Sequence, residues 1–198
     1  MLAAVSTPVT TLLVILVGYL VGSVPFALLV ARRHGIDDLR EVGDRNPGYW
    51  NTMEQLGQRS ALPVFVGDAA KGAIAAGFGL LLAGDGQWWM PVVGGGAAMV
   101  GHAYPVFAGF RGGRSVLAFV GAVIVYAPLA ALGALVTMIV VWVPTRKFDW
   151  AARVGVFAFP VWQLVIDGPH ETAATGVLMT FVGLRFAQAA IADRRPVT

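Results

Sequence analysis

The sequence has no cysteine and few charged residues, which make up 13% of its 198 positions. Without cysteine the chain cannot form a disulfide framework, a thiolate metal site or a cysteine nucleophile. Soluble domains carry about 25% charged residues. The shortage of charge, together with 57% hydrophobic residues and a mean hydropathy of +0.72, excludes a soluble globular protein and a disordered one. We therefore predict an all-α protein that lies in a lipid bilayer.

Apolar stretches predict the number of crossings, since a helix needs about 20 residues to span the hydrocarbon core. They occupy residues 8–30, 61–83, 88–110, 116–143, 154–166 and 172–192. The first lacks the basic start of a signal peptide, so we expect a retained helix. The stretch 116–143 contains Tyr126-Ala127-Pro128, where proline removes a backbone donor, and we expect two short crossings there. The prediction is one integral-membrane domain over residues 1–198, a polytopic bundle of seven crossings.

The positions of the 14 lysines and arginines predict the orientation. All of them can be placed on one side of the membrane, whereas the connections 84–87 and 167–171 contain neither residue type. Cytoplasmic connections retain positive charge. We therefore predict a multi-pass protein of the inner (plasma) membrane with its N-terminus out and its C-terminus in. The sequence pI is about 9.7, but the basic residues accompany helix ends, which argues against nucleic acid as a partner.

Polar residues gather in clusters on the predicted cytoplasmic side. Residues 31–60 form a long connection whose Tyr49 and Trp50 indicate an ordered loop, with an amphipathic interfacial helix as the alternative. Asp68 and Lys71 lie inside an apolar stretch at a spacing that puts them on one helix face, so they can pair. Ionisable residues at this depth favour a functional site over a structural ion pair.

The segment 101–115 contains His102 and then Arg111-Gly112-Gly113-Arg114. Paired glycines let the backbone approach an oxyanion and offer N–H donors, while two guanidinium groups suit bidentate recognition of phosphate. A helix starting at Val116 would add its positive end. Anchoring at the cytoplasmic interface explains the arginines equally, but not the glycines between them. Glycines inside the apolar stretches predict close helix packing; they are Gly18, Gly22, Gly77, Gly79 and Gly94-Gly95-Gly96.

The order of these clusters resembles the PlsY family of integral-membrane acyl-phosphate glycerol-3-phosphate acyltransferases, over essentially the whole chain. The residues that carry the resemblance are Gly22-Ser23-Val24-Pro25-Phe26, Asp38-Leu39-Arg40 with Val42-Gly43, Asp68 with Lys71-Gly72, and Gly101-His102 through Arg114. The resemblance implies a seven-helix bundle. It also implies transfer of an acyl group from acyl phosphate to the 1-hydroxyl of glycerol 3-phosphate, giving lysophosphatidic acid for phospholipid synthesis without a thioester donor, cofactor or metal.

The resemblance also implies roles for particular residues. His102 and Asn46 would sit at the reacting centre and orient the attacking hydroxyl or the acyl carbonyl. The residues expected to hold substrate phosphate are Lys71, Arg111, Gly112, Gly113, Arg114, Asn51 and Gly48. His102 as sole general base is one possibility, and proton transfer to a substrate phosphate is another. The expected partners are acyl phosphate, glycerol 3-phosphate and membrane lipid, and the active site would face the cytoplasm.

The first-loop motif departs from the family pattern, because serine, threonine and arginine are replaced by Asp44, Trp50 and Glu54. Carboxylates there invert the local charge of a phosphate site, and we expect Arg45 to offset part of it by pairing with one acid. The alternative function is a family member with a different acceptor, or a non-catalytic protein that binds lipid or a partner protein. A transporter of small anions or lipid headgroups ranks last, since transporter sites usually lie near the bilayer midplane.

Overall fold

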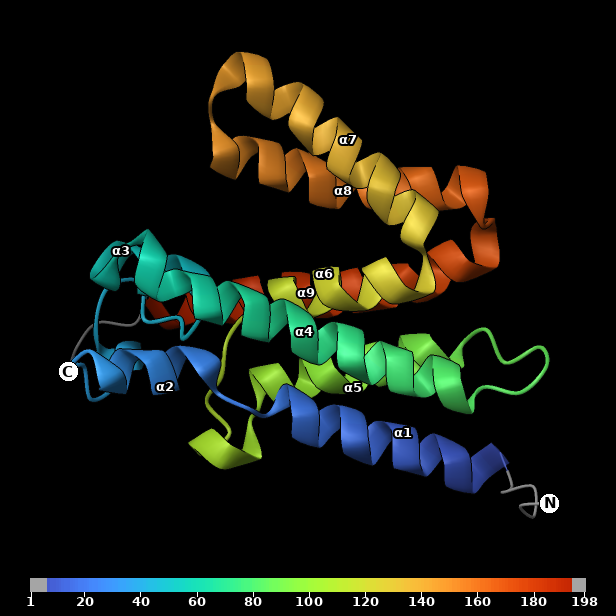
Figure 1. Cartoon of the computed structure of the whole chain (residues 1–198), viewed down its shortest axis with the longest axis horizontal. Coiled ribbons are helices and arrows are strands. Elements are labelled where there is room, and N and C mark those ends of the chain that lie inside the picture. The colour runs from blue at the N-terminus through green and yellow to red at the C-terminus, as the bar shows by residue number, and fades with distance from the viewer. Residues whose placement is uncertain (1–6, 194–198) are drawn as a thin grey trace.

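The computed structural model describes residues 7–193, which form helices and no strand (Figure 1). In chain order these helices are α1 (Thr7–Gly22), α2 (Phe26–Arg33), η1 (Leu39–Glu41), α3 (Tyr49–Leu56), α4 (Gln58–Leu82), α5 (Met90–Ala103), η2 (Val106–Ala108), α6 (Val116–Tyr126), α7 (Pro128–Thr145), α8 (Phe148–Ile166) and α9 (Pro169–Asp193). The all-α prediction is confirmed for the described residues. The stretches long and apolar enough to cross a membrane are Thr7–Arg33, Gln58–Leu82, Pro128–Thr145 and Pro169–Ala192.

The first apolar stretch is broken, so the single helix predicted over residues 8–30 is wrong. α1 ends at Gly22 and α2 begins at Phe26. Pro25 lies between them and has no N–H to donate, so the helical hydrogen-bond ladder cannot continue through it. The carbonyl groups of Gly22 and Val24 lie at this break, where both accept hydrogen bonds from Lys71 of α4.

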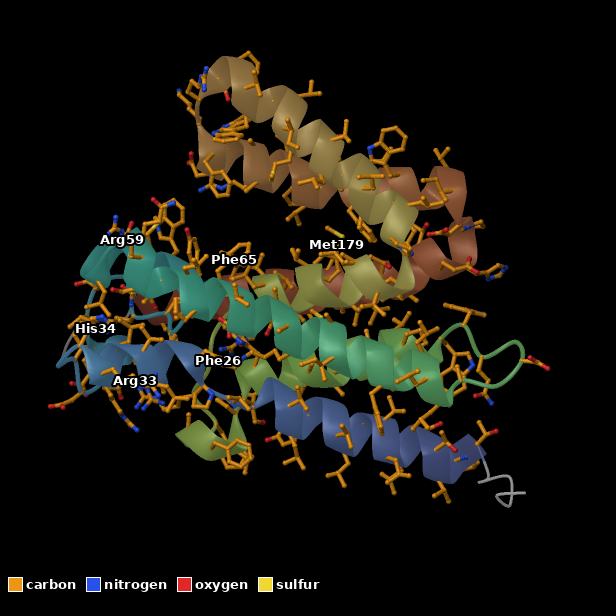
Figure 2. The ribbon with its side chains drawn as sticks, viewed as in Figure 1. Phe26, Arg33, His34, Arg59, Phe65 and Met179 are labelled. Carbon is orange, nitrogen blue, oxygen red and sulfur yellow. The ribbon has the colours of Figure 1, made fainter. Side chains whose placement is uncertain are left out.

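The second predicted break is confirmed, because α6 ends at Tyr126 and α7 begins at Pro128. α6 has 11 residues and is therefore only about 16 Å long. Figure 1 shows α7 and α8 as a hairpin that diverges from the layer of α4, α6 and α9. Figure 2 shows Phe65 and Met179 on the side of that layer that faces the hairpin.

Glycines bring neighbouring helices into backbone contact at most of the predicted positions. A Cβ atom at Gly22 would lie 2.6 Å from the Ala98 Cα, so α1 and α5 touch there. A side chain at Gly72 would meet the Ala118 carbonyl, where α4 touches α6. Gly77 is the exception: no atom lies within 4 Å of its added Cβ, so the packing role predicted for it is wrong.

The connection predicted as a loop over residues 31–60 contains helices of its own. α2 continues to Arg33, α4 begins at Gln58, and α3 lies between them. α3 is amphipathic, since Asn51 is fully buried while Trp50 is 42% exposed. The helix of the alternative prediction is therefore confirmed for residues 49–56, and its place at the membrane interface stays a prediction. Figure 2 places Arg33 and Arg59 at this same end of the molecule.

Candidate active site

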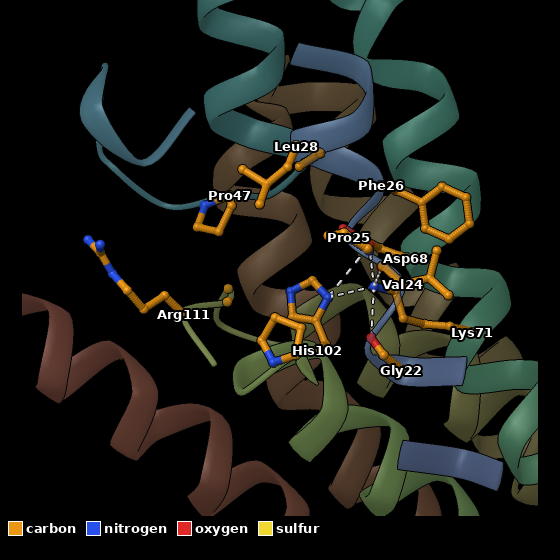
Figure 3. A pocket seen from close by; sticks show the side chains of 14 residues that line it. Gly22, Val24, Pro25, Phe26, Leu28, Pro47, Asp68, Lys71, His102 and Arg111 are labelled. Carbon is orange, nitrogen blue, oxygen red and sulfur yellow. Dashed lines mark hydrogen bonds and ion pairs between the residues drawn. The ribbon is translucent and has the colours of Figure 1, made fainter. Parts of the chain in front are cut away.

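A pocket opens where the α1–α2 break meets α4 and the end of α5 (Figure 3). Its lining combines backbone from the break with ionisable side chains from α4 and α5. It is lined by Gly22, Val24, Pro25, Phe26, Ala27, Leu28, Pro47, Asp68, Lys71, His102, Pro105, Arg111, Gly112 and Gly113. The pocket thus brings together five of the residues predicted for the site, namely Lys71, His102, Arg111, Gly112 and Gly113.

Lys71 is the most enclosed of these residues, with 2% of its side chain exposed. Its ammonium group donates to the carbonyls of Gly22 at 3.2 Å and Val24 at 2.9 Å. It also lies 2.8 Å from the Asp68 carboxylate, which confirms the predicted pairing, and 3.0 Å from Nδ1 of His102. An ammonium has three N–H donors, so Lys71 already has more acceptors than donors.

His102 closes the last turn of α5 and is 8% exposed. Its Nδ1 lies 3.0 Å from the Lys71 ammonium and 3.5 Å from the nearer Asp68 oxygen. A side chain at Gly113 would collide with Nε2 of the ring, so only glycine lets the loop pass this close to the imidazole. In Figure 3 one ring nitrogen faces Lys71 and the other points away, toward the side where Arg111 lies.

The N–H groups of Gly112 and Gly113 are not free to bind an anion. They donate to the carbonyls of Ala103 at 3.0 Å and His102 at 3.1 Å, which folds the loop back on the end of α5. This corrects the expectation that the paired glycines offer N–H donors. Their contribution is close approach, because a Cβ at Gly112 would lie 2.6 Å from Pro105 Cδ and meet the His102 carbonyl.

Two arginines that the sequence analysis left without a role hold this loop from either side. Arg40 donates to the carbonyls of Ala108 at 2.9 Å and Arg111 at 3.1 Å. Arg185 of α9 donates to the carbonyls of Gly112 at 3.2 Å and Gly113 at 3.3 Å. These pairings link segments far apart in the chain. The sequence signals were that both arginines fall on the same predicted side as the loop and that Arg40 belongs to a motif of the family resemblance.

Asp38 orients Arg40 through three short hydrogen bonds of 2.6 to 2.9 Å from the guanidinium. These bonds lower the pKa of the Asp38 carboxyl below its usual range, against the opposing effect of burial. The bidentate geometry is the strong form of a charge-assisted hydrogen bond. Asp38 therefore acts on the loop indirectly, because it fixes the position of Arg40 and Arg40 binds the loop.

Arg111 and Arg114 differ in their partners. The side chain of Arg111 is exposed, lines the pocket and forms no ion pair with any residue in the range 7–193. Arg114 does not line the pocket; its guanidinium lies 3.1 Å from the Asp44 carboxylate and stacks 4.9 Å from the ring centre of Phe186. The acid of the altered motif thus pairs with Arg114, and not with Arg45 as expected.

The remaining predicted residues lie on the first loop and outside the pocket lining. Asn51 is buried, and its amide donates to the carbonyls of Leu39 and Val42, so it holds the loop together. Gly48 is buried at the start of α3, and its carbonyl accepts from the Thr52 hydroxyl. The Asn46 backbone donates to Asp44 at 3.0 Å. Pro47, next to Asn46, is the point where this loop reaches the pocket.

Glu54 is held away from the loop's cationic residues. Its carboxylate accepts a 2.7 Å hydrogen bond from the indole of Trp50, one helical turn earlier, on the exposed face of α3. Residues 7–193 contain no group of three or more histidine, aspartate or glutamate side chains placed to hold a metal ion. The ionisable side chains that line the pocket are those of Asp68, Lys71, His102 and Arg111.

Comparison with known proteins gives consistent matches over nearly the whole chain. The family described as glycerol-3-phosphate acyltransferase matches residues 12–192. A glycerol-3-phosphate acyltransferase of Geobacillus kaustophilus is 42% identical over 177 residues, 88% of this chain and 88% of that protein. One of Bordetella petrii is 36% identical over 172 residues, 86% of this chain and 81% of that protein.

Solved structures agree with these sequence matches. The crystal structure of PlsY, an integral membrane glycerol 3-phosphate acyltransferase, in its glycerol 3-phosphate form superposes with a TM-score of 0.78 at 27% identity and covers 95% of both chains. Its lysophosphatidic acid form gives a TM-score of 0.76 at 26% identity and covers 94% of both.

Proposed function

The chain belongs to the glycerol-3-phosphate acyltransferase family, and we propose that it draws its acyl group from acyl phosphate, at the pocket between Lys71, His102 and Arg111. The protein is a membrane acyltransferase that acylates glycerol 3-phosphate and produces lysophosphatidic acid. With acyl phosphate as donor, the acceptor hydroxyl oxygen bonds to the acyl carbon and the bond from that carbon to the phosphate oxygen breaks. The hydroxyl proton ends on the departing phosphate.

The positive charge around the pocket supports two phosphate-bearing substrates. Arg111 lines the pocket, and its guanidinium has no ion-pair partner among residues 7–193, which suits bidentate binding of phosphate. Arg114 follows on the same loop. It holds a phosphate after its ion pair with Asp44 opens and the phosphate replaces the carboxylate. Lys71 also lies in the pocket lining, with its charge balanced by Asp68. Gly112 and Gly113 let the substrate come close to the loop, since neither carries a side chain.

His102 and Asn46 are the residues we place at the reacting centre. His102 reaches the pocket from the end of α5. Asn46 is the chain neighbour of Pro47, which lines the pocket, and we place its amide beside the substrate there. Gly48 and Asn51 contribute to phosphate binding indirectly, because their hydrogen bonds fix the conformation of the first loop. The observation that carries the assignment is the convergence of His102 and the unpaired Arg111 on one pocket beside the buried Lys71.

The test is release of inorganic phosphate by purified protein in lipid, given acyl phosphate with and without glycerol 3-phosphate. We expect release that requires glycerol 3-phosphate and is lost in His102→Ala. Arg111→Ala should raise the KM for a phosphate-bearing substrate and leave kcat closer to the parent value. Product formation from a different acyl donor, with none from acyl phosphate, would overturn the donor assignment. Release with another acceptor alone would support the altered-acceptor alternative.

We also propose seven crossings, formed by α1 with α2 and by α4 to α9, in the inner membrane, with the pocket facing the cytoplasm. Support comes from the charge distribution, since the connections 84–87 and 167–171 carry no lysine or arginine. The absence of native cysteine allows a clean test. Single variants Arg59→Cys and Lys147→Cys should resist an impermeant maleimide in intact cells, whereas Asp85→Cys should react. Equal labelling of the three would contradict the orientation.

A further inference from the structure

Lys71 binds its neighbours in a way that leaves it no free donor for a substrate. Its ammonium faces the carbonyls of Gly22 and Val24, the Asp68 carboxylate and His102 Nδ1, all at 2.8 to 3.2 Å. The carbonyls of Gly22 and Val24 are available as acceptors because Pro25 breaks the helix beside them. A group so enclosed and so fully bonded is suited to fixing its neighbours and not to following a substrate phosphate.

The Lys71 contact determines which nitrogen of His102 carries the proton. A charged ammonium can only donate, so a nitrogen 3.0 Å from it must accept. A proton on Nδ1 would point at a cation across this distance. The tautomer compatible with the contact therefore has its proton on Nε2 and a lone pair on Nδ1. No residue in the range 7–193 hydrogen-bonds to Nε2, and the ring lines the pocket.

Asp68 holds the Lys71 ammonium in place. Its carboxylate is 2.8 Å from Lys71 Nζ but 3.5 Å from His102 Nδ1, so its closer partner is the lysine. Both side chains are about 2 to 3% exposed, so little solvent reaches either charge. A buried cation without a partner is strongly disfavoured. Asp68 therefore acts on His102 through Lys71.

We propose that Asp68 and Lys71 are positioning residues that hold His102 neutral with its proton on Nε2, so that His102 meets the acyl carbonyl oxygen as a hydrogen-bond donor and not as a base. This inference rests on the proposed function of the pocket and deepens it. The Nε2–H group stabilises the negative charge that develops on that oxygen when the hydroxyl attacks. The imidazole proton stays on the ring, in keeping with transfer of the hydroxyl proton to the departing phosphate.

The first experiment reads the tautomer directly, by ¹⁵N NMR of histidine-labelled full-length protein in lipid. The chain has 3 histidines, so the variant His34→Gln/His170→Gln leaves only His102 visible. We expect a pyrrole-like signal from Nε2 and a pyridine-like signal from Nδ1. In this background, Asp68→Asn/Lys71→Met removes both buried charges at once and avoids an unpaired one. There we expect the proton to spread onto Nδ1.

The second experiment separates positioning from phosphate binding. Removing a single donor to a developing oxyanion costs about 10²- to 10³-fold in kcat. Because the proton spreads onto Nδ1 and the ring loses its anchor, we expect kcat to fall by up to that factor in Asp68→Asn and in Asp68→Asn/Lys71→Met, with the KM for glycerol 3-phosphate nearly unchanged. The matched control is Arg111→Gln, which should raise KM. A rise in KM at an unaltered kcat for the double variant would instead make Lys71 a phosphate ligand and overturn the inference.

The two experiments also separate this inference from the proposed function. A parent protein that transfers no acyl group from acyl phosphate would refute the donor assignment, yet the NMR spectrum would still report the tautomer. An active parent protein with its proton on Nδ1, or with an unchanged spectrum in the double variant, would refute the positioning role alone.

Discussion

Two carboxylate–cation arrangements lie beside the same loop, and they differ in burial. The buried trio comprises Asp68, Lys71 and His102, and its ion pair has side chains only 3% and 2% exposed. The rim pair comprises Asp44 and Arg114, with side chains 29% and 23% exposed. Water can replace either member of the rim pair as a partner, whereas nothing replaces a member of the buried trio. We infer that the trio sets the geometry of catalysis and the rim pair tunes substrate binding.

The largest effect should come from breaking the buried pair by one partner only. Lys71→Ala leaves the Asp68 carboxylate buried and unpaired, which typically costs about 3–5 kcal/mol. The free energy of unfolding in mixed detergent micelles should fall by that order. Arg114→Ala is the matched control on the rim, where the pair is partly exposed and an ion pair in contact with solvent contributes about 0–1 kcal/mol.

A double variant checks the reason for this loss. In Lys71→Ala/Asp68→Asn the unpaired charge is gone, so much of the lost stability should return while activity does not. Equal destabilisation by Lys71→Ala and Arg114→Ala would contradict the contrast between the trio and the rim.

The next effect concerns the loop that joins the two arrangements. In Gly112→Ala the new methyl group would meet the His102 carbonyl and lie 2.6 Å from Pro105, so the loop must move away from the imidazole. A displacement of about 1 Å at a reacting centre can cost about 10²-fold in rate, and kcat/KM for acyl transfer should fall by that order. Gly77→Ala on α4 is the control, because its Cβ meets no atom within 4 Å. Equal activity in the two variants would contradict the close-approach role.

Much of this site could be predicted because its signals are local in the chain. The pairing of Asp68 with Lys71 follows from helical spacing, and His102 and Arg111 belong to one short segment. The end of α6 at Tyr126 follows from Pro128. In each case the residue that decides the structure lies within a few positions of the one it affects.

The rest depends on contacts between distant segments. Pro25 carried the signal for a broken first helix, but the apolar stretch continues past it, and the ammonium that binds the broken backbone comes from α4. Arg185 reaches Gly112 from the last helix. Asn51 turns inward because α3 forms and buries the helix face that carries it. The motif alone does not specify which face of α3 is buried. Such pairings are products of the tertiary packing.

A smaller effect should follow from opening the rim pair. Asp44→Asn removes the carboxylate from Arg114 while keeping a side chain of similar size, so a substrate phosphate no longer competes for the guanidinium. An ion pair in contact with solvent is worth about 0–1 kcal/mol, which corresponds to a KM for glycerol 3-phosphate lower by at most about fivefold. The matched control is Glu54→Gln, whose parent carboxylate bonds to Trp50 instead. A rise in KM in Asp44→Asn would show that Asp44 assists binding.

The smallest effect is a dependence of the protein's stability on pH, which comes from the ion pair of Asp38 with Arg40 beside the same loop. The pKa of Asp38 is lowered by its hydrogen bonds from Arg40, so ionisation of Asp38 favours the folded state. This contribution to stability is complete above the pKa of the Asp38 carboxyl in the unfolded chain, which is about 4. It is lost as the pH falls through the lower pKa of the same carboxyl in the folded protein. Asp38→Asn should therefore flatten the acid side of the stability curve, measured by thermal unfolding between neutral and acidic pH. Asp37→Asn, at the exposed neighbouring position, should leave the curve unchanged; an identical acid limb in Asp38→Asn and the parent protein would refute the linkage.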